Sequence, residues 1–377
     1  MEIQWREYEL GELLSYEQPT PYIVESTDYN DKYKTPVLTA GKSFILGYTN
    51  ETNGVYTALP VIIFDDFTTA SQYVNFEFKV KSSAMKILTP NTELVLPKFI
   101  YYRMQIIQFD HSTHKRYWIQ QYSKIKVSIP PIPVQEQIVA KIEELFSELD
   151  NGVETLRKTK QQLAMYRQAV ISAAFPTITE ENIVRLDEIA DISGGITKGR
   201  VLSKQETIHL PYLRVANVQN GYLDLSQMKT IELKTSEMGK YLLCAGDVLY
   251  TEGGDRDKLG RGTVWNDEIP NCVHQNHVFK ARLDQTKANP RYVAYWSMSA
   301  FARNYFYNKG KQSVNLASIN KTVLSALTLP LPSLTEQEAA LREIESRLSV
   351  CDEIEKTVDT ALQQAEAMRQ SILKTGI

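Results

Sequence analysis

The feature that most constrains the fold of this chain is a long heptad pattern that occurs twice, each time directly after a proline-rich run. The first copy begins as "IPPIPVQEQIVAKIEELF" at residue 129, and the second as "LPLPSLTEQEAALREIESRL" at residue 329. A shift of 202 residues, without a gap, brings identical residues together, among them Pro130 and Pro332, Gln135 and Gln337, Glu143 and Glu345, Asp150 and Asp352, and Arg167 and Arg369. A weaker similarity relates "LGELL" near residue 10 to "LDEIA" near residue 186. We interpret the chain as a pseudo-twofold tandem repeat, whose halves open and close with related elements around a dissimilar middle.

The repeated element is predicted to be a long helix, because its apolar residues recur every seven positions. They are Ile142, Leu149, Leu156, Leu163 and Val170 in the first copy, and Ile344, Cys351, Val358, Ala365 and Ile372 in the second. A helix from about residue 134 to 175 would extend roughly 60 Å, and one small globule cannot cover its apolar stripe. We expect the two helices to pack as an antiparallel coiled coil with a globule at each end. Gly152, Thr159 and Lys160 interrupt the first stripe, so the packing is expected to be looser there.

The proline runs before the helices are expected to be extended, since proline blocks helix continuation and biases the residue before it. They would act as stiff exits that aim each helix at a fixed angle from its globule. The globules are predicted to be mixed α/β (α+β). "PVIIFDDF", "YVNFEFKVK" and "DVLYTEGG" have strand character, whereas "ELVLPKFIYYRMQIIQFD" and "NPRYVAYWSMSAFARNYFYN" have helical spacing. The predicted organisation is two globular domains, residues 1–130 and 179–330, and two helices, residues 131–178 and 331–377.

The composition indicates a globular protein of a reducing compartment. A length of 377 residues exceeds one ordinary core, so two or more domains are expected. No apolar run reaches the length of a membrane span, and the N-terminus lacks the pattern of a signal peptide. Three cysteines far apart in sequence, Cys244, Cys272 and Cys351, argue against a disulfide framework. We therefore expect a cytoplasmic protein without membrane contact.

The distribution of charge, rather than the net charge of −3, indicates a polyanionic partner. Residues 77–126 hold 9 basic and 3 acidic residues among aromatic ones, and residues 190–332 hold 18 basic against 12 acidic, so the acid is concentrated elsewhere. Basic side chains with aromatic neighbours suit a surface that contacts phosphates, although a solvated surface over an aromatic core is the alternative. The segment "TEGGDRDKLGRGTVW" (251–265) combines glycines with Arg256, Lys258 and Arg261 and with the acids Asp255 and Asp257, whose carboxylates can accept from cytosine. Such a loop can enter a DNA groove, where arginine binds guanine; a mobile surface turn is the alternative.

Other kinds of site are less well supported. "TAGKS" (39–43) lacks the first glycine of a phosphate-binding loop, because Pro36 stands at that position. "CVHQNH" (272–277) offers three residues that can bind zinc, but in a strand His277 would point away from the other two. Asp65 and Asp66 in "FDDF" would point to opposite faces of a strand. There is also no glycine-rich dinucleotide loop and no Asn-Pro-Pro-aromatic or Asp-Pro-Pro-aromatic run. The chain is therefore expected to carry no catalytic residues, metal or cofactor of its own.

Two dissimilar globules separated by two similar long helices, each after a proline-rich strand and a Gln-Glu or Glu-Gln pair, resemble the specificity subunit of Type I restriction-modification systems. The resemblance covers essentially the whole chain. In the second half, "LPYLRVANVQNGYLDL", "GDVLYTEGGDRDKLGRG", "NCVHQNHVFKARL" and "SVNLASINKTVLSALTLPLPSLTEQ" look like one type of target-recognition domain of that family. In the first half, "TPVLTAGKSFILGYT", "IIFDDFTT", "FKVKSSAMKIL" and "HKRYWIQQYSKIKVSIPPIPVQEQ" look like another.

The resemblance implies a DNA-reading subunit without catalysis of its own. Each target-recognition domain would read one half of a bipartite site in double-stranded DNA, and the helices would fix the gap and dock two methyltransferase subunits. S-adenosylmethionine, ATP and magnesium would belong to the methyltransferase subunits and to two restriction subunits that translocate and cleave DNA. A free-standing coiled-coil DNA-binding regulator and a fused methyltransferase or nuclease are the alternatives. The candidate DNA contacts are Lys42, Lys79, Lys81, Lys86, Lys115, Arg116, Arg214, Asn217, Arg256, Lys258, Arg261, Gln275, Asn276 and Lys311.

Overall fold

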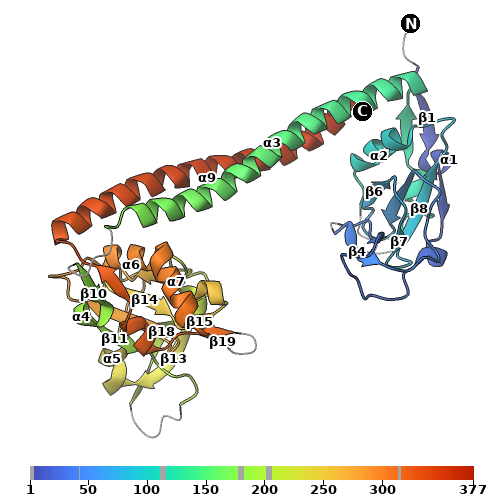
Figure 1. Cartoon of the computed structure of the whole chain (residues 1–377). Helices are drawn as coiled ribbons and strands as arrows, with labels where there is room; N and C mark the ends of the chain where they lie inside the picture. Colours follow the sequence, from blue (N-terminus) through green and yellow to red (C-terminus); the bar gives the residue numbers. More distant parts are fainter. Residues whose placement is uncertain (1–3, 42, 111–115, 177–181, 201–205, 313–315) are drawn as a thin grey trace. The chain divides into compact units, whose positions relative to one another are not determined.

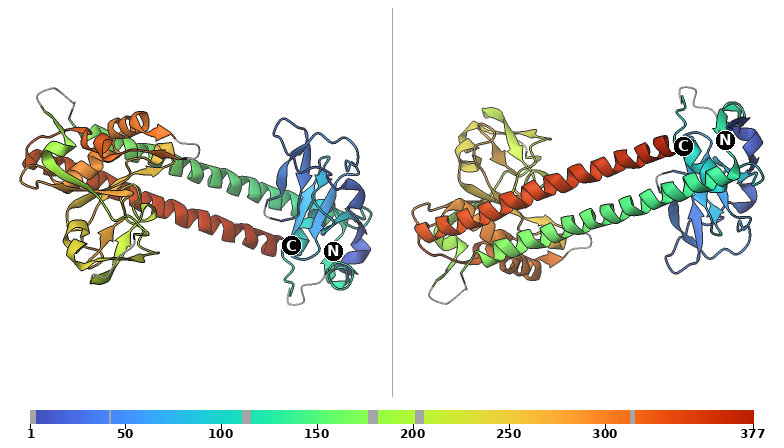
Figure 2. Two further views of the ribbon diagram at one scale, coloured as in Figure 1. Left: turned by 90° about the horizontal axis from the view of Figure 1, so that it is seen from below. Right: turned by 90° about the horizontal axis from the view of Figure 1, so that it is seen from above.

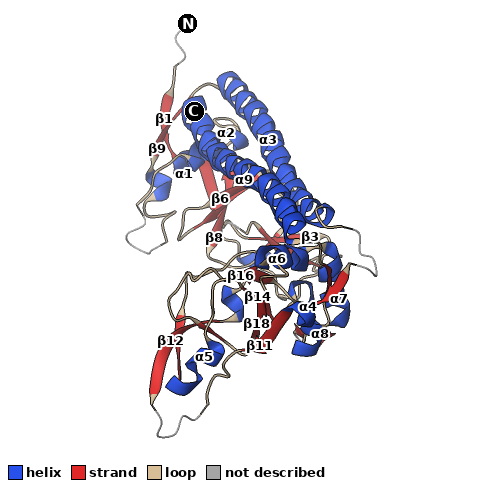
Figure 3. Ribbon diagram, turned by 90° about the vertical axis from the view of Figure 1, so that its left-hand side faces the viewer, coloured by secondary structure: helices blue, strands red, loops and turns tan. Residues whose placement is uncertain are grey.

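The computed structural model describes residues 4–41, 43–110, 116–176, 182–200, 206–312 and 316–377. The chain divides into two compact units, of which unit 1 comprises Met1–Leu156 and Thr360–Ile377 and unit 2 comprises Arg157–Asp359. Both units contain part of two long helices, α3 (Ile132–Ala173) and α9 (Leu334–Gly376). We call the globular part of unit 1 domain 1 (residues 4–129) and that of unit 2 domain 2 (residues 182–330); Figure 3 distinguishes their strands and helices.

Domain 1 consists of two sheets and a closing pair of strands. Its elements are β1 (Arg6–Glu9), α1 (Leu10–Leu13), β2 (Leu14–Glu17), β3 (Thr35–Leu38), β4 (Ile45–Thr49), β5 (Val61–Asp65), β6 (Ser71–Val74), β7 (Lys79–Val80), β8 (Met85–Pro90), α2 (Pro97–Gln105) and β9 (Lys126–Ile129). One sheet has the antiparallel order β2-β8-β5-β6, and the other has the order β4-β3-β7 with β3 and β7 parallel. Strands β1 and β9 pair antiparallel, so the two ends of the domain lie side by side.

Domain 2 contains the same arrangement with additions. Its elements are β10 (Ile183–Arg185), α4 (Leu186–Ile189), β11 (Ala190–Gly194), β12 (Thr207–Leu213), β13 (Lys229–Lys234), α5 (Met238–Tyr241), β14 (Asp247–Thr251), β15 (Gly253–Gly254), β16 (Gly262–Val264), β17 (Val273–His274), β18 (Val278–Leu283), α6 (Pro290–Met298), α7 (Ala300–Lys309), β19 (Lys311–Gln312), β20 (Ala317–Ser318), α8 (Lys321–Ser325) and β21 (Thr328–Pro330). Its sheets have the orders β11-β18-β14-β16 and β13-β12-β17, and β10 pairs with β21. A third sheet, β15-β20-β19, has no counterpart among the described residues of domain 1.

The middle of each half therefore differs in sequence but not in strand order, so the duplication extends further than the sequence similarity. An inner strand that is buried on both faces is also shared by the two domains. Alternate residues of β5 enter two separate clusters, since Ile62 belongs to one and Ile63 to the other. Strand β14 divides in the same way, with Val248 and Leu249 in different clusters. Both strands therefore lie inside their domains, with a paired strand on either side.

The predicted helices are confirmed, and they pack against each other in opposite directions. In unit 1 the beginning of α3 contacts the end of α9, and in unit 2 the end of α3 contacts the beginning of α9. Figures 1 and 2 show α3 in green and α9 in red side by side. The predicted heptad residues are buried at most positions, including Ile142, Leu163, Val170, Ile344, Cys351, Val358 and Ala365. Beside the interruption at Gly152 lies a hollow of about 440 Å³ lined by apolar residues of both helices.

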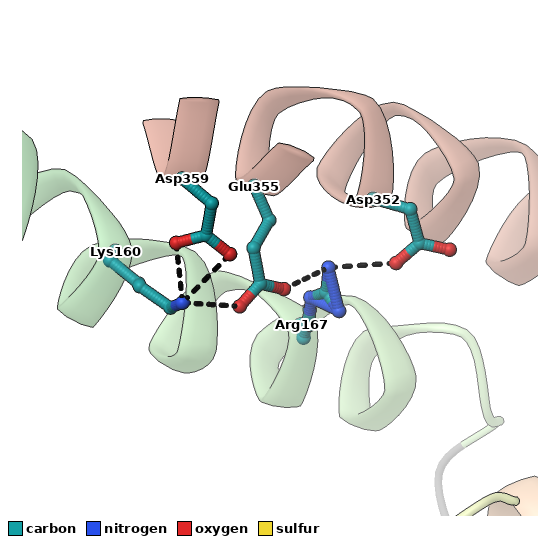
Figure 4. Close-up of polar contacts among 5 residues, drawn as sticks. All are labelled: Lys160, Arg167, Asp352, Glu355 and Asp359. Atoms are coloured by element: carbon teal, nitrogen blue, oxygen red, sulfur yellow. Dashed lines mark hydrogen bonds and ion pairs between the residues drawn. The ribbon is translucent and has the colours of Figure 1, made fainter. Parts of the chain in front are cut away.

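Ion pairs across the helices follow the internal duplication. In unit 2, Arg167 donates to Asp352 at 2.7 Å and to Glu355 at 2.9 Å (Figure 4). In unit 1, Arg369 pairs with Asp150. The shift of 202 residues converts one arginine–aspartate pair into the other, so the two contacts are equivalent. None of the described helices is long and apolar enough to cross a membrane.

Candidate nucleic-acid interface

The loop between β14 and β16, residues 252–261, carries three basic and three acidic residues, and its end is held in a fixed shape by the glycines on both sides of Arg261. Gly260 has a φ of 64°, and a Cβ on it would lie 2.2 Å from the ring of Phe306. A Cβ on Gly262 would lie 2.7 Å from the carbonyl oxygen of Leu249. The carbonyl oxygen of Arg261 accepts a hydrogen bond from the Thr251 amide at 2.9 Å. The backbone of Arg261 is thus fixed by packing and hydrogen bonding, which reduces the entropy lost when its side chain binds a ligand.

The guanidinium of Arg261 differs from the other cations of this loop in its partners. Its Nη1 donates to Oε1 of Gln219 at 3.1 Å, and its Nε has no hydrogen-bond partner. Among the described residues, no carboxylate lies within ion-pair distance of it. Lys258 instead pairs with Asp255, and this hydrogen bond holds the pKa of the Asp255 carboxyl below its usual range. Arg256 lies over the ring of Tyr307 at 4.5 Å. The half-buried Arg261 therefore has no protein carboxylate to neutralise its charge within the described residues, although its Nε is buried.

Two neighbouring hollows adjoin this loop. One of about 300 Å³ is lined by residues that include Gln219, Gly253, Lys258 and Arg261. The other, of about 520 Å³, is lined by residues that include Glu252 and His277, whose Nδ1 donates to the Glu252 carboxylate at 2.5 Å. The hollows present cationic donors, a carboxylate acceptor and an amide. These are the groups that recognise base edges and phosphates.

The other candidates of domain 2 lie in different environments. Asn217 is buried, and its side chain accepts from the Arg214 amide at 2.9 Å and donates to the Asp224 carbonyl at 2.8 Å. It organises the turn rather than facing solvent. Arg214 is half-buried and donates to the Gln227 carbonyl. Gln275 and Asn276 are half-buried beside His277, and Lys311 is exposed on β19.

In domain 1 the structure places two predicted contacts in the interior. The amino group of Lys79 contacts the Glu51 carboxylate at 2.9 Å and the Asn53 carbonyl, and only 3% of the residue is exposed. Lys86 pairs with the buried Asp66 at 3.2 Å. Since a buried ammonium group requires such partners, both lysines have a role inside the domain, and we omit them from the candidate interface.

The exposed cations of domain 1 include Arg116 and Lys81. Arg116 lies 6.0 Å from the ring of Phe67, an exposed residue of the loop between β5 and β6. Asp66 fixes this arrangement, because its carboxylate accepts from the Trp118 amide at 2.8 Å and its carbonyl accepts from the Tyr117 amide. Lys42 and Lys115 lie outside the described residues. Arg116 and Arg261 thus both adjoin the loop that follows the inner strand of a four-stranded sheet.

The residues weighed as alternative sites have internal partners. The Nδ1 of His274 donates to the Val278 carbonyl at 2.7 Å, and burial lowers the pKa of its imidazole to about 4. Burial likewise raises the pKa of the Cys272 thiol to about 12. Asp65 accepts from the amides of its own turn, and "TAGKS" joins two antiparallel strands instead of a strand and a helix. In the part of the chain that is described, no group of three or more His, Cys, Asp and Glu side chains could hold a metal ion.

Gln219 is the residue of this region that the sequence did not identify. It belongs to a hairpin turn, where its amide donates to the Tyr222 carbonyl and its side chain bonds Arg261. The turn signal "NVQNGY" could have located the hairpin. It could not have located the contact with a residue 42 positions away.

Comparisons with known proteins agree with this picture. The family model for the Type I restriction modification DNA specificity domain matches residues 2–163 and 179–364. The chain is 32% identical to the Type I restriction enzyme EcoR124I/EcoR124II specificity subunit of Escherichia coli over 352 residues, which are 90% of this chain and 85% of that relative. A structure that addresses complex assembly and conformational transition of the type I R-M system matches with a TM-score of 0.70 at 15% identity, over 100% of this chain and 98% of that one.

The HsdS subunit from Thermoanaerobacter tengcongensis matches with a TM-score of 0.52 at 15% identity, over 99% of this chain and 96% of that subunit. The two structural matches establish the fold alone, whereas the family model matches both repeats. The repeat, the domain topology and these matches lead to the same conclusion: the chain belongs to the family of Type I restriction-modification specificity subunits.

Proposed function

We propose that this chain reads a bipartite site in double-stranded DNA, with one half of the site assigned to each domain. The observation that carries the proposal is the repetition of one strand order in two domains whose loops differ. Equal frameworks support equal modes of binding, and different loops support different sequences. The guanidinium of Arg261, which is bonded to the Gln219 amide rather than to a carboxylate, and the exposed Arg116 support a cationic contact in each domain.

We further propose that α3 and α9 set the gap between the half-sites and dock two methyltransferase subunits, joined by two restriction subunits. The apolar hollow beside Gly152 and the exposed apolar residues Met165, Tyr166, Val350 and Met368 support a protein partner on the coiled coil. In this assignment the chain contributes recognition. Methyl transfer with S-adenosylmethionine and ATP-driven steps with magnesium belong to the partner subunits.

An exchange of domain 2 tests the assignment of half-sites. Residues from about 193 to 328 would be replaced by the equivalent region of a relative, and the sites methylated by the assembled complex would be sequenced. We expect one half-sequence to change while the other half and the gap are retained. A change in both halves would contradict the modular assignment. Self-association of the chain without a methyltransferase partner would favour a free-standing regulator instead.

A helix insertion tests the role of the coiled coil. Four residues added to each helix, near Thr159 and near its equivalent Ala361, lengthen both helices by roughly 6 Å, which is close to two base-pair steps. We expect the preferred gap to increase by about one or two base pairs with both half-sequences unchanged. An unaltered gap from a folded variant would show that the helices only bury apolar surface.

A further inference from the structure

Gln135 in α3 and Gln337 in α9 form the same buried junction in the two units. Neither residue has any exposed surface. The Oε1 of Gln135 accepts from the amide of Leu96, the residue before α2, at 2.8 Å. Its Nε2 donates to the carbonyls of Leu94 at 3.0 Å and Pro130 at 2.8 Å. One side chain thus connects the first turn of α3 to the start of α2 and to the proline exit.

Gln337 repeats these three bonds. Its Oε1 accepts from the amide of Asn289, the residue before α6, at 2.8 Å. Its Nε2 donates to the carbonyls of Lys287 at 3.0 Å and Pro332 at 2.8 Å. All the partners in both junctions are backbone atoms. The junction therefore does not depend on the domain side chains, and it persists although Leu94 and Leu96 correspond to Lys287 and Asn289.

A second pair of contacts fastens the same helices. Lys98 at the start of α2 pairs with Glu143 of α3. The equivalent Arg291 at the start of α6 pairs with Glu345 of α9. Further along these helices, burial raises the pKa of Tyr102 to about 12, with a contribution from Glu143. Burial also raises the pKa of Tyr295, with a contribution from Glu345.

These polar contacts set the direction in which each helix leaves its domain, and they bury little apolar surface. The proline exit alone leaves the torsions on either side of it to set the helix angle. The glutamine removes that freedom, because three bonds in different directions hold one side chain. An apolar side chain of similar size could fill the space but could not hold the two backbone segments in register.

We propose that Gln135 and Gln337 are positioning residues that fix the angle between each domain and its helix, and thereby restrict the gap length that the chain accepts in DNA. This inference rests on the proposed reading of a bipartite site. Neither residue touches DNA; each acts by limiting how far its domain can swing relative to the helix. If the angle between domain and helix could vary, the two domains would bind half-sites at several separations. If the angle is fixed, they bind half-sites at one separation.

The test uses Gln135→Met, Gln337→Met and the double variant in the full chain assembled with its methyltransferase subunits. Methionine approximates the length of glutamine and makes none of the three bonds. Binding is measured on duplexes with the half-sites selected by the wild-type complex and gaps altered by one or two base pairs. We expect the preference for the best gap over its neighbours to fall by about tenfold in the double variant, with a smaller fall in each single variant. The half-sequence preferences should not change.

A core variant separates positioning from loss of stability. Ile63 is fully buried in domain 1, in a cluster that contains none of the junction residues. Ile63→Val should therefore destabilise the domain without removing a bond of the glutamine, and its gap preference should remain that of the wild type. A double variant that folds but keeps the wild-type gap preference would overturn the inference. A wild-type complex without any gap preference would instead contradict the proposed function.

Variants of the ion pairs keep the inference testable if the methionine variants fail to fold. The double variant Lys98→Met with Arg291→Met removes the ion pair to Glu143 in unit 1 and to Glu345 in unit 2. These side chains are partly exposed, so the protein should still fold. The preference for the best gap should fall, but by less than in the double methionine variant of the glutamines. Unchanged gap preference in this folded variant would then count against the inference.

Discussion

Domain 1 and domain 2 are alike where they join the helices and unlike where they face solvent. The attachments repeat bond for bond and keep the same residues on the helices: Gln135 and Gln337 make equivalent bonds, and Glu143 and Glu345 accept from a lysine and an arginine at equivalent positions. The loop after the inner strand does not repeat. In domain 1 it is short and anchored by Asp66, whereas in domain 2 it is long and rich in glycine and in charged residues of both signs.

The difference separates two demands on one fold. Contacts that both domains need for the same mechanical purpose keep their residues, and the contacts that distinguish the domains change theirs. Within a single chain, internal repetition therefore marks the framework, and its absence marks the candidate reading surface.

The largest expected effect comes from breaking the buried ion pair of Lys86 and Asp66 in domain 1. Lys86→Met leaves the Asp66 carboxylate buried beside the Trp118 amide without its cation and should cost about 3–5 kcal/mol of unfolding free energy. Arg282→Met in domain 2 should cost less, because the guanidinium that is lost is 42% exposed and the buried Asp247 keeps a second cation, Lys280, close enough to interact with it. Hydrogen exchange with denaturant, read separately on peptides from each domain, measures both. Equal losses would contradict the proposed difference in burial.

Acid should weaken domain 2 through His274. Its pKa is lowered from 6.5 to about 4, so the folded imidazole stays neutral while the unfolded chain takes up the proton first. The stability that this difference provides is complete above pH 6.5 and falls as the pH drops toward 4, by on the order of 3 kcal/mol. Thermal unfolding across this pH range should show the fall in wild type and in the control His277→Gln, but much less of it in His274→Gln. An equal fall in all three proteins would assign the acid sensitivity to other groups.

Paired and unpaired cations of the domain 2 loop should contribute unequally to DNA binding. Arg261→Ala should weaken binding by about 1–3 kcal/mol if its donors form a bidentate base contact. Lys258→Ala should have a smaller effect, because Asp255 already neutralises that lysine. Affinity measured at several salt concentrations would distinguish a base contact from a phosphate contact, which mainly flattens the salt slope. Unchanged affinity and slope in both variants would remove this loop from the interface.

The smallest effects should come from the equivalent ion pairs of the coiled coil. Arg167→Ala and Arg369→Ala should each cost about 0.2–1 kcal/mol, since both pairs are partly exposed. Double-mutant cycles with Asp352 and Asp150 should return similar coupling energies if the pairs are equivalent. A clear inequality would point to the contacts that the two arginines do not share, which are Glu355 for Arg167 and the ring of Phe146 for Arg369.

Regular, local patterns were predictable from the sequence. The heptads located both long helices to within a few residues, because an amphipathic stripe repeats through neighbouring turns. The strands at "PVIIFDDF" and "DVLYTEGG" were also found. A single helical stretch at "NPRYVAYWSMSAFARNYFYN" divides in the structure into α6 and α7, because Ser299 ends one helix and caps the next through its hydroxyl.

Contacts between distant residues were not predictable in the same way. Lys79 and Lys81 cannot be distinguished in "FKVKS", yet Lys81 is exposed and Lys79 is buried. The amino group of Lys79 forms an ion pair with Glu51, which lies 28 residues earlier in the sequence. The common strand order of the domains also depends on pairings such as β5 with β8, which no local pattern encodes. The candidate interface was therefore predicted as a region, while its members had to be separated by burial and by partner.

The antiparallel packing of α3 and α9 also has a consequence in time. The apolar stripe at the beginning of α3 is covered by residues 360–377, which are synthesised about 200 residues later. At about 5–20 residues per second, Leu149 and its neighbours wait roughly ten to forty seconds for the segment that covers them. During this interval the apolar stripe of α3 is exposed to solvent on the ribosome-bound chain, which is when the chain is most prone to aggregate.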